Sequence, residues 1–135
     1  MNPIASANPI DDSATRNIIM HVNVGDPVQL NLVLNNLENI LEHYTKRGNQ
    51  VEIRVVCHGP GLTLLRRDTS PVRERLEGMT DNPEQLAFSA CSNTLERITK
   101  AEGKAPEILE AAILVPAGLP EIIELQRQGW IYLKP

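Results

Sequence analysis

The sequence predicts an α/β domain: a three-layer α/β/α fold with a mostly parallel five-stranded sheet, in a flavodoxin-like variant. Apolar, β-branched runs alternate with amphipathic helical patterns, and this alternation continues to the end of the chain. A length of 135 residues with 41% apolar content fits one domain. Parallel strands joined by helices require right-handed crossovers, so we expect helices on both faces of the sheet.

The first strand and helix have the clearest signals. Residues 17–24 are rich in β-branched side chains, as expected of a largely buried strand. The Asp-Pro-Val-Gln run at 26–29 supplies an N-cap acid, a proline at the first helical position and a glutamine three residues after the cap. Apolar side chains then recur at helical spacing over 30–44, and Gly48 is expected to end the helix.

The same alternation predicts the remaining elements. Further strands are expected at 51–56, 85–89, 112–115 and 130–133, and helices at 62–67, from Ser70-Pro71 onward, at 92–100 and at 118–128. Residues 1–16 contain two Asn-Pro pairs and no apolar period, which predicts a flexible N-terminal arm ahead of a single domain at 17–135.

Composition excludes several classes of function. A net charge of −4 and the lack of long Lys/Arg clusters argue against binding nucleic acid or a membrane surface. No segment resembles a signal peptide or a membrane span, and two cysteines are too few for a disulfide framework, so a cytoplasmic protein is expected. Three histidines without metal-ligand spacing predict no metal, and 3% aromatic residues argue against flavin, so no cofactor is expected.

Candidate chemistry gathers where the strands end. Ligand sites of open α/β sheets lie beyond the carboxyl ends of the strands, and both Cys57 and Cys91 follow predicted strands. Cys91 also precedes a helix, whose free N–H groups and dipole favour thiolate over thiol. Ser89 and Ser92 are candidate helix caps, and Asn93 is a candidate donor to an anion or a persulfide. The alternative is a small buried cysteine among ordinary cap and turn residues.

A second candidate is the turn that follows Cys57. His58 is a candidate base or thiolate stabiliser, but adjacent residues at a strand end point to opposite faces, so a direct Cys57–His58 pair is not expected. Gly59 and Gly61 form a Gly-Pro-Gly turn compatible with an anion site, although it lacks the P-loop and dinucleotide patterns. His21, inside the first strand, is expected to be a core or interface histidine.

Residues 17–135 resemble the DsrE/DsrF-like proteins of intracellular sulfur metabolism, a family that includes the TusD-type sulfur-relay subunits. The resemblance depends on four blocks in order: HVNVGDPVQLNLVLNNLENIL, VVCHGPGLTLL, FSACSNTL and VPAGLPEIIELQRQGWIYLKP. It implies that Cys91 receives sulfur as a persulfide and passes it to a partner's thiol. It also implies a homotrimer or homohexamer, and it gives Cys57 no role.

Three hypotheses follow. The leading one is a sulfurtransferase-like sulfur carrier that holds sulfane sulfur on Cys91 and works with sulfur-donor and sulfur-acceptor proteins. In it, Cys57 is an auxiliary residue if its side chain lies near Cys91. The alternative is a non-catalytic module that binds a small anion at Gly59–Gly61 and at the helix start Ser89–Thr94. The third is a structural oligomer subunit with buried cysteines.

Overall fold

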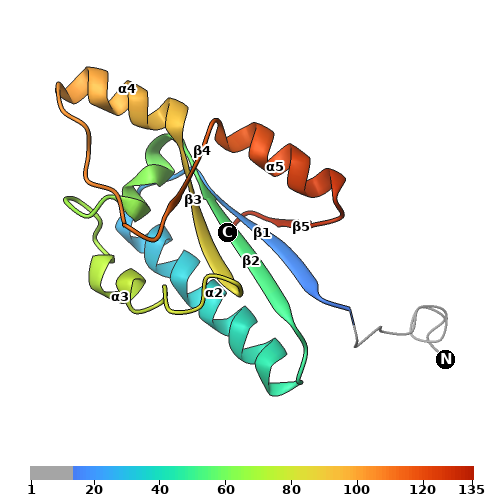
Figure 1. Ribbon diagram of the computed structural model, residues 1–135. Coiled ribbons are helices and arrows are strands. Elements are labelled where there is room, and N and C mark those ends of the chain that lie inside the picture. The colour runs from blue at the N-terminus through green and yellow to red at the C-terminus, as the bar shows by residue number, and fades with distance from the viewer. Residues whose placement is uncertain (1–13) are drawn as a thin grey trace.

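A computed structural model describes residues 14–135, which form one parallel sheet with helices on both faces (Figure 1). The strand order is β4-β3-β2-β1-β5. The strands are β1 (Arg16–Val22), β2 (Val51–Cys57), β3 (Leu86–Cys91), β4 (Ile113–Val115) and β5 (Ile131–Leu133), and every neighbouring pair is parallel. This is the predicted three-layer α/β/α fold in a flavodoxin-like layout; flavodoxin itself has the order 2-1-3-4-5. Residues 1–13 of the predicted arm lie outside the described residues.

The helices follow the predicted order closely. They are α2 (Pro27–Lys46), the 3₁₀ helix η1 (Gly59–Leu65), α3 (Arg73–Glu77), α4 (Ser92–Glu102) and α5 (Gly118–Arg127). Asp26 is the N-cap of α2, and its side chain accepts a hydrogen bond from the Gln29 N–H at 3.1 Å, as the sequence predicts. No helix within residues 14–135 is both long enough and apolar enough to cross a lipid bilayer.

Most elements differ from their predicted bounds by one or two residues at an end, and the helix expected from Ser70-Pro71 begins only at Arg73. Two further differences lie near the candidate site. The helix expected at 62–67 is a 3₁₀ helix that begins three residues earlier, at Gly59. The strand expected at 85–89 continues to Cys91, because its last residues still pair with β2 and β4. Cys91 is therefore both the last residue of a strand and the N-cap of a helix.

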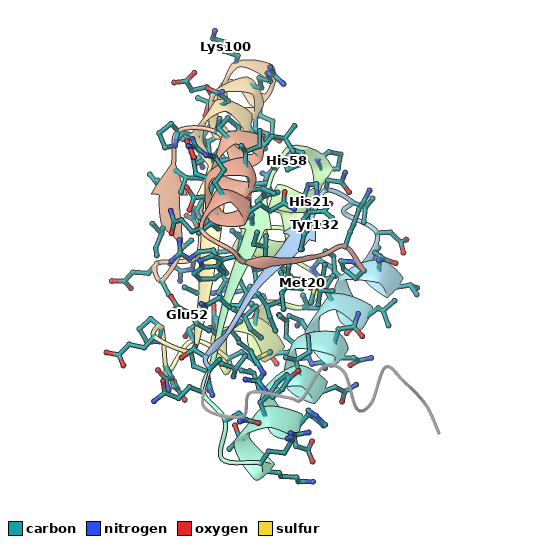
Figure 2. The ribbon with its side chains drawn as sticks, turned by 90° about the vertical axis from the view of Figure 1, so that its right-hand side faces the viewer. Met20, His21, Glu52, His58, Lys100 and Tyr132 are labelled. Atoms are coloured by element: carbon teal, nitrogen blue, oxygen red, sulfur yellow. The ribbon has the colours of Figure 1, made fainter. Side chains whose placement is uncertain are left out.

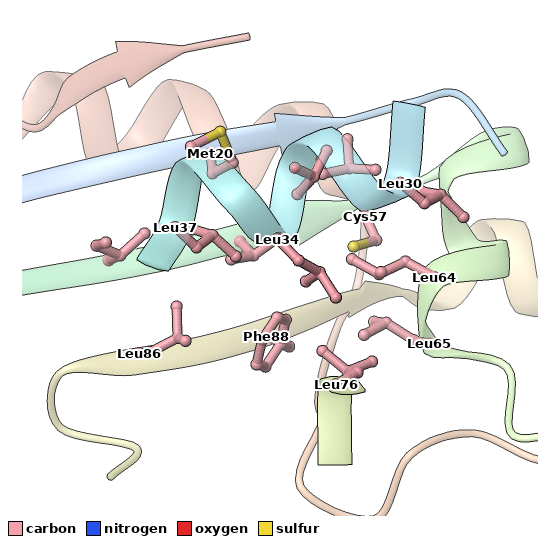
Figure 3. Packing of buried hydrophobic residues seen from close by; sticks show 14 of the residues in the cluster. Met20, Leu30, Leu34, Leu37, Cys57, Leu64, Leu65, Leu76, Leu86 and Phe88 are labelled. Carbon is pink, nitrogen blue, oxygen red and sulfur yellow. The ribbon is translucent and has the colours of Figure 1, made fainter. Parts of the chain in front are cut away.

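The sheet has a large core on one face and a small one on the other. The large core packs the sheet against α2, η1 and α3, and Figure 3 shows part of it, including Met20, Leu34, Leu37, Cys57 and Phe88. The core on the second face consists of Ile19, Val56, Ile122 and Leu125, with Trp130 against them. Each large side chain that is fully buried contributes about 1.5–3 kcal/mol, so most of the stabilisation comes from the α2 face.

The connections change faces between β3 and β4. Helix α4, which follows β3, packs Leu95 and Ile98 against the large core, whereas α5, which follows β4, packs Ile122 and Leu125 on the opposite face. When adjacent parallel strands send their helices to opposite faces, a crevice opens at their carboxyl ends, and open α/β sheets bind ligands there. Cys91 lies at this point of the sheet, and α5 begins beside it.

Candidate functional site around Cys91

The starts of two helices meet at the Cys91 sulfur. Cys91 is the N-cap of α4, and the backbone N–H groups of Asn93 and Thr94 in the first turn act on its sulfur. The N–H group of Gly118, the first residue of α5, acts on the same atom. Cys91 closes no capping hydrogen bond of ordinary geometry, so these N–H groups stabilise the sulfur as nearby dipoles. The sequence places Cys91 at one helix start; the fold adds a second.

This environment lowers the pKa of the Cys91 thiol. Burial on its own raises the pKa, but the Thr94 hydroxyl and the N–H groups of Thr94, Gly118 and Asn93 outweigh burial, and the net shift is downward. The residue exposes 5% of its surface. The thiolate is thus favoured at a sulfur that is nearly enclosed, so we expect only small reagents to reach it.

Thr94 links Cys91 to the turn after β2. Its hydroxyl donates to the Cys91 sulfur and accepts a hydrogen bond from the Gly59 N–H at 2.9 Å. Gly59 has a φ of +55°, a left-handed conformation that favours glycine. The turn is therefore held by the same hydroxyl that stabilises the thiolate.

Gly118 fits between Cys91 and His58. A Cβ atom at this glycine would come within 2.9 Å of the His58 Cβ and 3.2 Å of the His58 Cγ. A larger residue at this position would clash with the His58 ring. Glycine therefore allows the N–H group to reach the sulfur while the imidazole packs against the Gly118 Cα. Strand pairing puts Cys57 opposite Ala90. The residues that follow them, His58 and Cys91, are therefore also neighbours across the end of the sheet.

The predicted site residues divide into two groups. Ser89 is fully buried on β3, on the same face of the strand as Cys91, and its Oγ has no hydrogen-bond partner among the described residues. Ser92 and Asn93 form the first turn of α4, and Asn93 is exposed. Neither serine caps α4, contrary to expectation: Ser89 lies within β3, and Ser92 is the first helical residue after the N-cap Cys91.

The turn glycines have structural roles. The Gly59 N–H is used by Thr94, and the Gly61 N–H donates to the His58 carbonyl at 3.0 Å. A Cβ on Gly61 would lie 2.1 Å from the Val22 carbonyl oxygen, so this glycine is required by the close approach of two backbones. With both amide groups bonded inside the chain, neither is free to hold an anion.

Cys57 lies apart from this site. It is 0% exposed, belongs to the large core on the α2 face, and burial strongly raises the pKa of its thiol (Figure 3). The neighbouring His58 points to the opposite face, where its ring contacts His21. The expectation that Cys57 and His58 do not form a direct pair is confirmed, and Cys57 takes the place of an aliphatic core residue.

Sequence reasoning missed four contributors: Thr94, Gly118, His21 and Tyr132. Thr94 lies within the segment singled out at the start of α4, and a hydroxyl residue three positions after an N-cap is a usable signal. Gly118 acts from the start of another helix, and the pairing of His21 with Tyr132 joins residues 111 positions apart. No local pattern contains these two contacts.

Among residues 14–135, no three His, Cys, Asp or Glu side chains are grouped closely enough to hold a metal ion. The site is thus built from one sulfur, several N–H groups, a hydroxyl and a neighbouring imidazole. These groups suit nucleophilic chemistry at sulfur.

Comparison with known proteins gives a structural neighbour without an assigned function. A scan against protein-family models finds no match, and a search of curated proteins finds none either. Among solved structures, the chain is similar to MTH1491, a protein of unknown function from Methanobacterium thermoautotrophicum, with 29% sequence identity and a TM-score of 0.74. The similarity covers 89% of this chain and 99% of that one. It supports the fold and leaves the chemistry to be argued from the site.

Proposed function

We propose that the protein is a sulfurtransferase-like sulfur carrier in which the Cys91 thiolate accepts sulfane sulfur and yields it to another thiol. The observation that carries the proposal is the meeting of two helix starts and the Thr94 hydroxyl at one sulfur, with the pKa of the Cys91 thiol lowered despite burial. The resemblance to the sulfur-relay proteins, in which the matching cysteine carries the persulfide, supports the same assignment.

The transfer proceeds by thiol exchange. The Cys91 thiolate attacks the sulfane sulfur of a donor R–S–SH; a new S–S bond forms at Cys91, the donor's S–S bond breaks, and R–S⁻ leaves with the electron pair. An acceptor thiolate then attacks the outer sulfur, and Cys91 leaves as the thiolate. Sulfane sulfur moves between thiols without net oxidation. The N–H groups around Cys91 stabilise the anion at the start and at the end.

Mass spectrometry of the intact protein tests the proposal. Incubation with inorganic polysulfide is expected to add one sulfur atom, released again by a small thiol. The Cys91→Ala variant should gain none, whereas Cys57→Ala, which removes a thiol from the core, should gain as much as the wild type. Equal gain in the Cys91→Ala variant would overturn the assignment.

Binding of a small anion without covalent chemistry is the competing function. It is disfavoured because the Gly59 and Gly61 amides are bonded within the chain. Thermal stabilisation by small anions that survives Cys91→Ala would favour it, since a ligand that binds only the native state raises stability.

We further propose that the chain works in the cytoplasm as a homotrimer or homohexamer, exchanging sulfur with donor and acceptor proteins. Both described cysteines are free thiols, which suits a reducing compartment.

Large apolar side chains are exposed on the two edge strands and on α5: Ile113, Leu114, Leu119, Ile123, Ile131 and Leu133. Their burial between copies would favour closed assembly. Light scattering measures the mass directly, and a monomer at micromolar concentration would contradict this proposal.

A further inference from the structure

Three side chains, two from the strands β1 and β5 and one from the residue that follows β2, form a row beside the sulfur site. The His21 Nε2 lies 2.6 Å from the His58 Nε2, and the His21 Nδ1 lies 2.6 Å from the Tyr132 hydroxyl (Figure 2). The two imidazole rings are within 20° of parallel, with centroids 4.8 Å apart. Because the centroids are farther apart than the nitrogens, the two rings meet edge to edge through those nitrogens. Such contacts are hydrogen bonds that share protons.

Counting protons along the row gives two arrangements. A neutral imidazole has one N–H donor and one acceptor nitrogen. In the first arrangement, Tyr132 donates to the His21 Nδ1, the His21 Nε2–H donates to His58, and the His58 Nδ1 carries a hydrogen. In the second, every bond is reversed and the His58 Nδ1 is bare. Conversion of the first into the second releases one proton from the His58 Nδ1 and takes one up at Tyr132, with both short contacts kept.

The surroundings disfavour the charged form of both histidines. Burial, the neighbouring His58 and Lys134 lower the pKa of His21, and burial and Lys134 lower the pKa of His58. On the α5 side, Glu121 in the first turn of that helix is paired with Arg54 at 3.1 Å. Among the described residues, no carboxylate makes a hydrogen bond or ion pair with either imidazole. If both imidazoles were protonated, each would direct an N–H group at the other across 2.6 Å. The two histidines together therefore accept at most one added proton.

The row ends beside Cys91. The His58 ring packs on the Cα of Gly118, whose N–H acts on the Cys91 sulfur. The other end, Tyr132, is 38% exposed on the edge strand β5. The His58 Nδ1 has no hydrogen-bond partner among the described residues, whereas its Nε2 is held by His21. The row thus runs from a partly exposed tyrosine to a histidine that packs against Gly118 and keeps one ring nitrogen free.

We propose that His58 protonates the thiolate that leaves when Cys91 takes sulfur, and that His21 and Tyr132 compensate by passing a proton to the other nitrogen of His58. This inference rests on the proposed function. As the donor's S–S bond breaks, R–S⁻ takes the proton from the His58 Nδ1. The His58 Nε2 takes a proton from His21, His21 takes one from Tyr132, and Tyr132 regains one from water. This leaves the row in the second arrangement, with the His58 Nδ1 bare. In the second half of the reaction the acceptor thiol gives its proton to this nitrogen as it becomes a thiolate, every proton in the row moves back, and Tyr132 returns one to water. His58 is thus the catalytic acid and then the base; His21 and Tyr132 position it and keep it neutral.

The leaving group tests this assignment, because only a basic thiolate needs a proton. We would measure the rate at which Cys91 forms mixed disulfides with hydroxyethyl disulfide, whose leaving thiolate is basic, and with dithiobis-nitrobenzoate, whose leaving thiolate departs unprotonated. With hydroxyethyl disulfide, His58→Gln is expected to lower the rate about 100-fold. Tyr132→Phe, which keeps the ring and removes only the hydroxyl, is expected to lower it roughly fivefold. With the aromatic disulfide, both variants should react within about twofold of the wild type.

Tyr44→Phe, on α2 and away from the row, is the matched control and should match the wild type with both reagents. Equal losses with both reagents would show a structural effect on Cys91 and overturn the relay, as would the absence of any loss. Because these reagents carry no sulfane sulfur, the assay separates the relay from sulfur carriage: if polysulfide adds no sulfur to Cys91 while the leaving-group dependence holds, only the proposed function fails.

Discussion

Replacing Thr94 by valine tests how the fold stabilises the Cys91 thiolate. Valine keeps the shape and β-branching of threonine but removes the hydroxyl, which donates to the Cys91 sulfur and accepts from the Gly59 N–H at 2.9 Å. Two losses follow from one atom. The thiolate loses a hydrogen-bond donor, and a half-buried backbone N–H loses its acceptor.

The expected magnitudes follow from the kinds of bond removed. A hydrogen bond to a charged group contributes about 1.5–3 kcal/mol, and the lower end applies because Cys91 closes no capping bond of ordinary geometry. One pKa unit corresponds to about 1.4 kcal/mol, so the pKa of the Cys91 thiol should rise by about one unit. The unpaired Gly59 N–H should lower the free energy of unfolding by about 1 kcal/mol.

The pH dependence of alkylation by iodoacetamide reports the pKa, and urea unfolding reports the stability. Thr99→Val is the matched control, because its hydroxyl bonds to the Leu95 carbonyl within α4 at 2.8 Å, away from the sulfur. It should leave the alkylation profile unchanged. If the two variants have the same thiol pKa, the Thr94 hydroxyl does not stabilise the thiolate and the account of the site is refuted.

Three further results are expected. Gly61→Ala should lower the free energy of unfolding by about 3 kcal/mol or more, since the new Cβ meets the Val22 carbonyl oxygen at 2.1 Å and backbone must move; a loss below about 1 kcal/mol would contradict the close approach. Because burial lowers the pKa values of His21 and His58, the unfolded chain binds more protons, and stability should fall as the pH drops through about 6.5. Titration by urea unfolding checks the sign, and a flat profile would count against buried neutral imidazoles. Native alkylation should label one cysteine and spare Cys57, with labelling of both contradicting its burial.

Gly103→Ala provides a comparison for Gly61→Ala. Gly103 has a φ of +72°, and a Cβ added there would have no atom within 4 Å, so its substitution costs only backbone strain of about 1 kcal/mol. Because Gly61 has no positive φ, its substitution carries no such strain, and a larger loss at Gly61 than at Gly103 must come from the steric clash.

The sequence predicts the elements well because local chemistry determines them. The Asp26 cap and the apolar period of α2 are properties of adjacent residues, as is the placement of Cys91 at a helix start. The strand order is not predictable in this way. Strand β5 pairs with β1, at the opposite edge from β4, because α5 crosses the second face of the sheet, and only packing determines this crossing.

The site also has one part that the sequence predicts and one part that only the fold brings together. The thiol and the first turn of α4 are contiguous, so the sequence identifies them together. The Gly118 N–H comes from another helix, and the His21–His58 contact joins side chains 37 positions apart. In the sequence, His21 alternates with apolar neighbours and is predicted to be a core or interface histidine. Its burial agrees with that prediction, but its hydrogen bonds depend on strands that meet only in the folded sheet.

A direct titration of the Cys91 thiol in the native protein tests the central claim. The ultraviolet absorbance of the thiolate is followed against pH in the wild type, with Cys91→Ala subtracted to remove the tyrosine and Cys57 contributions. The convergence of N–H groups on the sulfur predicts a midpoint below the value of about 8.5 found for an unperturbed cysteine. A midpoint at or above that value would mean that burial outweighs the dipoles, and the sulfur would then have no special reactivity.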